Sequence, residues 1–345
     1  MNKVIKMARL SVSILLFFYI SSLCSGVSVV HVSSKQVDLS IEVYYDITGS
    51  KNDDRFNISL FCSIDGGETY SSVLKHVEGD VGYDISGGFG KKIVWNVLEE
   101  MNHLIAKEVV FKVRLEYIPE EARNMIFIEG DKYRMGRSNG SPDEKPAHEV
   151  IIDDFYIGQY EVTVMEYRKF CTETNYPMPD KNIEWLDQHP ITYIDWFDAN
   201  AYCQWLSKKT GKKFRLPTEA EWEFAAKGGI KSGNYFYAGS DNINDIGWYK
   251  TNSEGVTHSK VGSLTPNELN LYDMSGNVWE WCYDWYSDKY YEHSPEKNPN
   301  GPRIGNLKTG RGGSWHDPAV PVTYRFYMSS TAGSDFMGFR VVMES

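Results

Sequence analysis

The stretch Leu271-Tyr-Asp-Met-Ser-Gly-Asn-Val-Trp-Glu-Trp-Cys-Tyr-Asp-Trp285 is the most informative part of this chain. It places three tryptophans, three acidic residues, an amide and a glycine within fifteen positions. Its apolar residues follow neither the alternation of a half-buried strand nor the 3.6-residue period of an amphipathic helix. Such a segment packs its aromatic rings around an irregular backbone, and its polar groups then need hydrogen-bond partners.

Length and charge limit the class of protein. The chain has 345 residues, which is more than one ordinary domain needs, so two domains are expected. Its formal net charge is −11, which disfavours nucleic acid as a partner because phosphate binding needs a basic face. Aromatic residues make up 14% of the chain, a share that is too high for a disordered protein.

Residues 1–26 have the pattern of a signal peptide. Lys3 and Lys6 form a basic start, an apolar run extends from Leu10 to Ile20, and small residues follow up to Gly26. The run is too short for a membrane span, and no second long apolar stretch occurs. We therefore expect an exported protein that is periplasmic, secreted or associated with the outer surface, without a transmembrane span in the mature chain.

Residues 27–118 are expected to form a first domain of β-strands. Apolar residues alternate with polar ones from Val37 to Ile47, from Phe56 to Ile64 and from Val109 to Tyr117. Turn signals such as Asp65-Gly66-Gly67 separate the runs. The spacing predicts a small all-β sandwich of immunoglobulin-like size. It carries no catalytic constellation, so an interaction or spacer role is expected.

Residues 119–345 are expected to form a second domain of the α+β class. Thr163 with Glu166, and Thr218 with Glu221, have the spacing of a capping box, which marks the start of a helix. After Gly228 the chain is rich in glycine, asparagine, serine and aromatic residues and has little periodicity, which is typical of a loop-rich domain. The predicted elements are strands within Met125–Gly130 and Phe155–Val162 and helices within Val164–Thr174, Phe197–Lys209 and Leu216–Ala226.

Six ordered motifs carry a resemblance to a known family. They are Tyr160-Glu-Val-Thr163, Ile191-Thr-Tyr-Ile-Asp-Trp196, Arg215-Leu-Pro-Thr-Glu-Ala-Glu-Trp-Glu223, Asn270-Leu-Tyr-Asp-Met-Ser-Gly-Asn-Val-Trp-Glu-Trp281, Arg311-Gly-Gly-Ser-Trp315 and Gly338-Phe-Arg340. Together they resemble the formylglycine-generating enzyme (sulfatase-modifying factor) family, over roughly residues 123–345. The resemblance implies a compact, loop-rich fold related to C-type lectins and bound calcium. In catalytic members it also implies oxidation of a sulfatase cysteine to formylglycine.

The chain departs from the family where that oxidation takes place. The family's chemistry uses two cysteines that bind copper shortly after the Arg-Gly-Gly-Ser motif, because soft thiolates suit Cu(I). The corresponding positions here fall near Asp317 and Val322, and no cysteine occurs after Cys282. We therefore do not expect copper or formylglycine generation.

Four cysteines remain beyond the signal segment, namely Cys62, Cys171, Cys203 and Cys282. Four in about 320 residues do not make a disulfide scaffold. Buried free thiols and a single bridge within the second domain are both consistent with this count.

The resemblance also implies a structural calcium site. Asn277, the carbonyl of Val278 and Glu280 match family ligands, and hard oxygen donors suit Ca²⁺. The alternative is that Asn277 shapes the turn after Gly276 while Glu280 accepts backbone hydrogen bonds.

The resemblance places the substrate groove of catalytic relatives near the Arg-Gly-Gly-Ser motif. A mixture of aromatic and charged groups can bind a peptide, a glycan or a small acid. The alternative is ordinary loop packing, with Arg325 paired to a carboxylate. The groove candidates are Trp315, His316, Asp317, Tyr324 and Arg325.

Three functions are consistent with these residues. The leading hypothesis is a module that binds a protein or a glycan at the cell surface or in the periplasm. The second is an oxidative enzyme with non-heme iron held by His316, Asp317 and a remote ligand, although the eight histidines lack metal-binding spacing. The third is a structural subunit of an envelope or secretion assembly.

Overall fold

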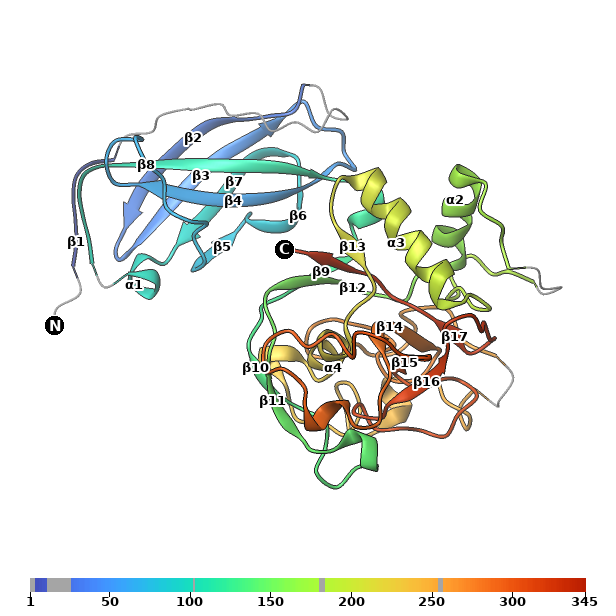
Figure 1. The fold of residues 1–345 in the computed structure, drawn as a ribbon. Coiled ribbons are helices and arrows are strands. Elements are labelled where there is room, and N and C mark those ends of the chain that lie inside the picture. The colour runs from blue at the N-terminus through green and yellow to red at the C-terminus, as the bar shows by residue number, and fades with distance from the viewer. Residues whose placement is uncertain (1–3, 11–25, 102, 180–183, 254–256) are drawn as a thin grey trace. The chain divides into compact units, whose positions relative to one another are not determined.

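The computed structural model describes residues 4–10, 26–101, 103–179, 184–253 and 257–345. The chain divides into two compact units, Met1–Arg123 and Asn124–Ser345, each with its own sheets (Figure 1). Most of the apolar run of the predicted signal peptide, residues 11–20, lies outside the described residues. Within the described part of the chain, no helix has the length and apolar character needed to cross a bilayer.

The first unit consists of two four-stranded sheets. One sheet has the strand order β1-β8-β4-β6 and the other has the order β2-β3-β7-β5, and Figure 1 shows β8 lying along β4. A short helix, α1 (Val97–Glu100), follows β7. The strands are β1 (Val4–Leu10), β2 (Ser28–Val37), β3 (Ser40–Thr48), β4 (Arg55–Ser63), β5 (Val77–Gly79), β6 (Gly82–Ser86), β7 (Gly88–Trp95) and β8 (His103–Ile118).

Alternating apolar residues from both sheets share one core, as the sequence pattern predicts. Buried side chains from β3 and β7 pack in the same cluster as buried side chains from β4 and β8. The predicted run from Val37 to Ile47 is not a single strand, however. Asp38 has φ +53° in the turn that separates β2 from β3, and Val37 and Leu39 are exposed beside it. The immunoglobulin-like assignment stays a prediction.

The second unit contains two four-stranded sheets and one two-stranded sheet. Their orders are β13-β18-β12-β9, β16-β15-β14-β17 and β10-β11. The strands and helices of this unit are β9 (Met125–Ile128), β10 (Lys132–Met135), β11 (His148–Ile151), β12 (Phe155–Gly158), α2 (Val164–Thr174), α3 (Trp196–Thr210), β13 (Phe214–Arg215), α4 (Glu219–Ala226), β14 (Trp279–Trp285), β15 (Leu307–Arg311), β16 (Phe326–Ser329), β17 (Met337–Gly338) and β18 (Val342–Glu344). Short 3₁₀ turns are formed by Glu120–Ala122, just before this unit, and by Pro142–Glu144, Gly229–Lys231, Ile243–Asp245 and Tyr290–Glu292 within it.

Side-chain caps set the starts of the three longer helices. Thr163 and Thr218 each accept a hydrogen bond from the backbone N–H of the Glu three residues later, and both capping boxes predicted from the sequence are present. Asp195 caps α3 in the same way, and Gly211 ends α3 in the left-handed conformation. The predicted helix ends are therefore confirmed to within three residues.

The Leu271–Trp285 block is a buried turn followed by strand β14. At Gly276, φ is +90° and an added Cβ would lie 2.2 Å from the carbonyl oxygen of Trp248, so only glycine fits there. Most of β14 is buried on both faces. The apolar residues of the block therefore need not alternate, which explains why no period is visible in the sequence.

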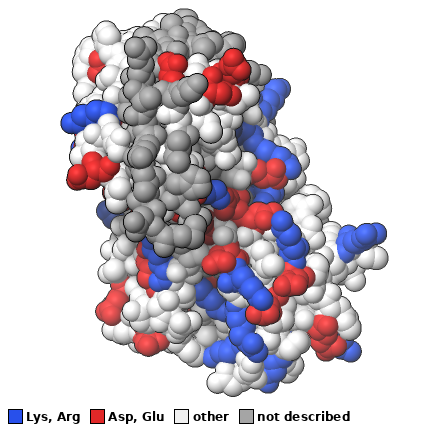
Figure 2. Space-filling model, turned by 90° about the vertical axis from the view of Figure 1, so that its left-hand side faces the viewer, with Lys and Arg blue, Asp and Glu red and all other residues white. Residues whose placement is uncertain are grey.

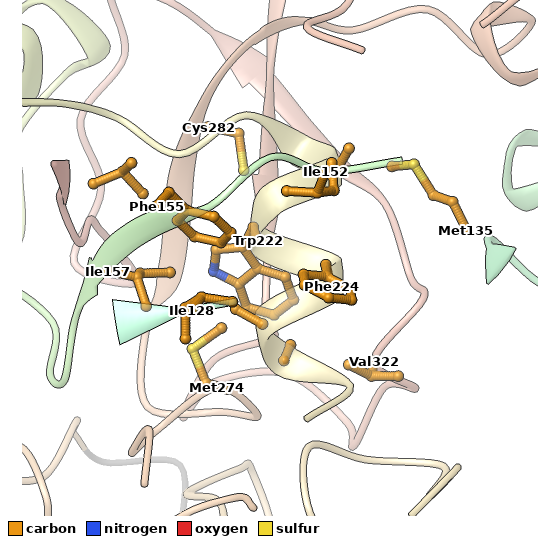
Figure 3. Packing of buried hydrophobic residues seen from close by; sticks show 14 of the residues in the cluster. Ile128, Met135, Ile152, Phe155, Ile157, Trp222, Phe224, Met274, Cys282 and Val322 are labelled. Carbon is orange, nitrogen blue, oxygen red and sulfur yellow. The ribbon is translucent and has the colours of Figure 1, made fainter. Parts of the chain in front are cut away.

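Helix α4 supplies the centre of the second unit's core. The Trp222 side chain is fully buried, and Figure 3 shows it surrounded by Ile128, Phe155 and Met274 from other elements. Its indole N–H donates to Glu280 Oε2 at 2.7 Å. The core thus joins α4 directly to β14.

Charged side chains of both signs are scattered over one face of the molecule. On the face shown in Figure 2, Lys and Arg residues are interspersed with Asp and Glu residues.

Candidate functional site

The loop of residues 312–325, which joins β15 to β16, carries the predicted groove residues. Gly312 and Gly313 follow β15 with φ of +104° and +87°, a conformation that favours glycine, and the chain turns there. Where the loop ends, the Phe326 ring stacks on the Trp279 ring of β14 at 4.7 Å between centroids. Packing against the sheet therefore positions the loop.

Asp317 presents a carboxylate that the protein holds in place. Its Oδ2 accepts hydrogen bonds from Trp279 Nε1 at 2.8 Å and from the Ser314 hydroxyl. The second position that the resemblance assigns to a copper cysteine, Val322, is buried in the hydrophobic core. A half-buried acid and a core valine do not fit a Cu(I) centre, which needs thiolates.

A connected set of aromatic rings begins at Trp279, whose indole donates to Asp317. The Trp279 ring lies 5.9 Å from that of Tyr324. Phe326 lies 6.3 Å from Phe336, whose ring stacks on His316 at 6.2 Å. We call this set, with the acidic groups beside it, the aromatic–acidic surface: Asp143, Tyr286, His316, Asp317, Tyr324, Phe326, Tyr327 and Phe336, with the buried Trp279 packed against them.

The outer part of the aromatic–acidic surface is accessible and lies near negative charge. Tyr327 is 49% exposed, and its ring stacks on Tyr286 at 4.3 Å. The Tyr286 hydroxyl donates to Asp143 at 2.8 Å. Burial raises the pKa of Tyr324, and the negative charges of Asp143 and Asp317 raise it further. Rings beside carboxylates favour a cationic ligand group.

Three of the predicted groove residues lie on this surface, and two do not. His316, Asp317 and Tyr324 belong to it. Trp315 is buried, and its indole N–H donates to the Asp335 carbonyl at 3.3 Å. Trp315 therefore supports the surface from below.

Arg325 points into the protein. Its guanidinium makes two hydrogen bonds with Glu219, at 2.7 and 2.8 Å, and donates to the carbonyls of Asp143 and Ser287. Its side chain has no exposed area. Arg325 is therefore paired with a carboxylate, which is the alternative expected from the sequence, and it is not available to a ligand.

The predicted calcium ligands make hydrogen bonds within the protein. Asn277 Oδ1 accepts the N–H of Ser259 at 2.9 Å, and Asn277 Nδ2 donates to Glu161 at 2.6 Å. Both oxygens of Glu280 accept from Arg340, each at 2.6 Å. The side-chain oxygens of Asn277 and Glu280 are thus engaged by Ser259 and Arg340, and a calcium ion held by Asn277, Val278 and Glu280 stays a prediction.

Three buried carboxyl groups, those of Glu161, Asp273 and Glu280, lie near the single guanidinium of Arg340. Glu161 and Asp273 are also buried there, and one oxygen of Asp273 has no hydrogen-bond partner among the described residues. Burial raises the pKa of Glu161 well above its usual range, and burial also raises the pKa of Asp273 to about 6. The folded protein therefore holds protons there more tightly than the unfolded chain.

The raised pKa of Asp273 predicts that the folded protein loses stability as the pH rises from about 4 to 6. Its stabilising contribution is present below about pH 4 and is lost as the pH rises through about 6, because the folded state binds the proton more tightly. As the pH rises through this range, the free energy of unfolding of Asp273→Asn should fall by roughly 2–3 kcal/mol less than that of the wild type. Urea unfolding at pH 4.5 and pH 7.5 measures it. Asp288→Asn, at an exposed position, is the control, and equal profiles for Asp273→Asn and the wild type would refute the assignment.

The described cysteines are free and buried: Cys62, Cys171, Cys203 and Cys282. Burial raises the pKa of Cys171 to about 11, which favours the inert thiol over the thiolate. Among the described residues no group of three His, Cys, Asp or Glu side chains is placed to hold a metal ion. His316 and Asp317, the proposed iron ligands, thus have no third ligand within that part of the chain.

Sequence reasoning missed the rings that extend the surface beyond the loop. Phe326 and Tyr327 directly follow the predicted Tyr324 and Arg325, so their adjacency was a usable signal. Phe336 and Tyr286 meet them through pairing and packing of distant segments, which the sequence does not display.

Comparisons with known proteins match the second unit. A profile of the family described as "Sulfatase-modifying factor enzyme 1-like domain" matches residues 114–345. The formylglycine-generating enzyme of Streptomyces coelicolor is 28% identical over 289 residues, which cover 64% of this chain and 90% of that enzyme. The structure of PvdO from Pseudomonas aeruginosa superposes with a TM-score of 0.60 and 27% identity, covering 66% of this chain and 96% of PvdO.

Other similar proteins have different names. The serine/threonine-protein kinase pkn1 of Chlamydia pneumoniae is 31% identical over 243 residues, which cover 62% of this chain and 38% of the kinase, so the chain spans about two fifths of that relative. The chaperone protein LppX of Paenibacillus barcinonensis is 30% identical over 241 residues, covering 56% of this chain and 78% of LppX.

Proposed function

The chain belongs to the family of sulfatase-modifying factor enzyme 1-like domains, and from this premise we propose that its second unit is a binding module for a basic segment of another protein. Family membership supplies the fold, but function depends on the site. The observation that carries the proposal is Asp317. It is a carboxylate held by Trp279 and Ser314, in a loop where the family resemblance places a reactive cysteine.

The chemistry of the aromatic–acidic surface supports this class of ligand. A Lys or Arg side chain gains cation–π contacts from Tyr327 and Tyr324 and an ion pair with Asp317 or Asp143. Arg325 does not compete for these acids with its guanidinium, because it is paired with Glu219 inside the protein. The similarity to a protein named as a chaperone supports a role in binding.

We also place this module in the cell envelope. The signal-like pattern of residues 1–26 supports export, and the first unit, whose two sheets share a core, then serves as an immunoglobulin-like spacer or interaction domain. A structural subunit of an envelope assembly is a special case of the same proposal, in which the bound segment belongs to a neighbouring subunit.

Binding to matched peptides tests the proposal. Basic, neutral and acidic peptides of one length, and a panel of glycans, are presented to the full chain in biolayer interferometry. Basic peptides should bind most tightly. Asp317→Asn keeps the acceptor for Trp279 and Ser314 but removes the charge, and Tyr327→Ala removes the exposed ring. Each should weaken binding about fivefold, equivalent to about 1 kcal/mol.

Tyr235→Ala is the control, because Tyr235 is 42% exposed and lies outside the aromatic–acidic surface. Equal binding of acidic and basic peptides, or variants that bind like the control, would overturn the proposal. Glycan binding that depends on Tyr327 but not on the charge of Asp317 would replace the peptide by a glycan as the ligand.

A further inference from the structure

Two histidines outside the aromatic–acidic surface face each other across a long sequence separation. His189 Nδ1 and His258 Nδ1 are 3.2 Å apart, and their rings are inclined at 64° with centroids 5.3 Å apart. The function proposed above uses neither residue.

The backbone on both sides of this pair is held in place. The His189 N–H donates to the Leu186 carbonyl at 3.0 Å, and the His189 carbonyl accepts the N–H of Val164 at 2.9 Å. On the other side, the N–H of Ser259 donates to Asn277 Oδ1 at 2.9 Å. The two rings therefore meet because anchored segments bring them together, and the facing nitrogens are a feature of the fold.

The separation of these nitrogens matches that of two ligands on one metal ion. Zinc binds histidine nitrogen at 2.0–2.1 Å with tetrahedral geometry, which places two such nitrogens about 3.3 Å apart. Imidazole suits zinc, copper and nickel and does not suit calcium or magnesium.

We propose that His189 and His258 are two ligands of a site for a borderline divalent transition metal such as Zn²⁺ or Cu²⁺. Without the ion, one Nδ1–H donates to the other Nδ1. When the ion binds, that hydrogen is carried by Nε2 of the same ring, and both Nδ1 lone pairs face the metal. No third His, Cys, Asp or Glu completes the group among the described residues, so water or a bound ligand fills the remaining positions.

The experiment uses the tag-free full chain, stripped with a chelator and titrated with Zn²⁺ alone in competition with a chromophoric chelator. One equivalent should bind. His189→Gln and His258→Gln keep a polar side chain, and each should weaken zinc binding at least about tenfold. The control is His293→Gln, whose side chain is 83% exposed, and it should bind zinc like the wild type. Far-UV circular dichroism checks that each variant is folded.

Electron paramagnetic resonance with Cu²⁺ identifies the ligands directly. The wild type should show coupling to two imidazole nitrogens, and each single variant should show coupling to one. Zinc affinity that is unchanged in the folded variants, or a copper spectrum that is the same in the wild type and in the double variant, would overturn the proposal. Because no peptide is used, the result is independent of the proposed binding function.

Discussion

Replacing Arg340 with methionine is expected to lower the free energy of unfolding of the second unit by roughly 3–5 kcal/mol. Arg340 makes two hydrogen bonds of 2.6 Å with Glu280 and also donates to the carbonyls of Gly158 and Tyr272. Both members of the ion pair are fully buried. Without the guanidinium, the Glu280 carboxylate stays buried without its cation, and neutralising it costs free energy.

Urea unfolding of the full chain, followed by tryptophan fluorescence, measures this change, because every tryptophan except Trp95 lies in the second unit. Arg168→Met is the matched control, since Arg168 pairs with Asp187 at the surface. It should cost less than about 1 kcal/mol. Adding Glu280→Gln to Arg340→Met should restore part of the lost stability, because a neutral amide needs no cation. Equal losses for Arg340→Met and Arg168→Met would contradict the account.

Arg325→Met is expected to cost about 3 kcal/mol of stability and to weaken binding at the aromatic–acidic surface less than Tyr327→Ala does. Glu219 would lose two short hydrogen bonds. The expected loss is near the lower end of the range for buried pairs, because Arg311 Nε remains 3.7 Å from Glu219.

Two measurements on the same variant separate stability from binding. Urea unfolding gives the stability, and peptide binding well below the unfolding midpoint gives the affinity, with Tyr327→Ala as the reference for a change at the surface. A folded Arg325→Met protein that retains its stability but binds basic peptides more weakly would show that Arg325 contributes to ligand binding.

Local signals in the sequence predicted the regular elements well. The capping residues Thr163 and Thr218 lie within a few positions of the groups they bind, so their spacing is visible in the sequence. The same holds for the alternating strands of the first unit, whose buried residues point to one shared core. A turn is harder to place, because Val37 and Leu39 continue the alternation through the hairpin at Asp38.

Partners distant in the sequence explain what could not be predicted. Arg325 and Glu219 are 106 residues apart, and Arg340 and Glu280 are 60 residues apart. A sequence shows that such charges exist but not which of them meet. The pairing of Glu280 with Arg340 and of Arg325 with Glu219 both depended on that missing information.

We infer that the loop around Asp317 binds a ligand and does not perform the thiolate chemistry of formylglycine-generating relatives. The most direct test is incubation of the full chain with a sulfatase Cys-x-Pro-x-Arg peptide, Cu(I) and oxygen, followed by mass spectrometry of the peptide. The Streptomyces coelicolor enzyme, named for this activity, serves as the positive control. The peptide cysteine should remain unchanged, and its conversion to formylglycine would show that the chain performs this oxidation.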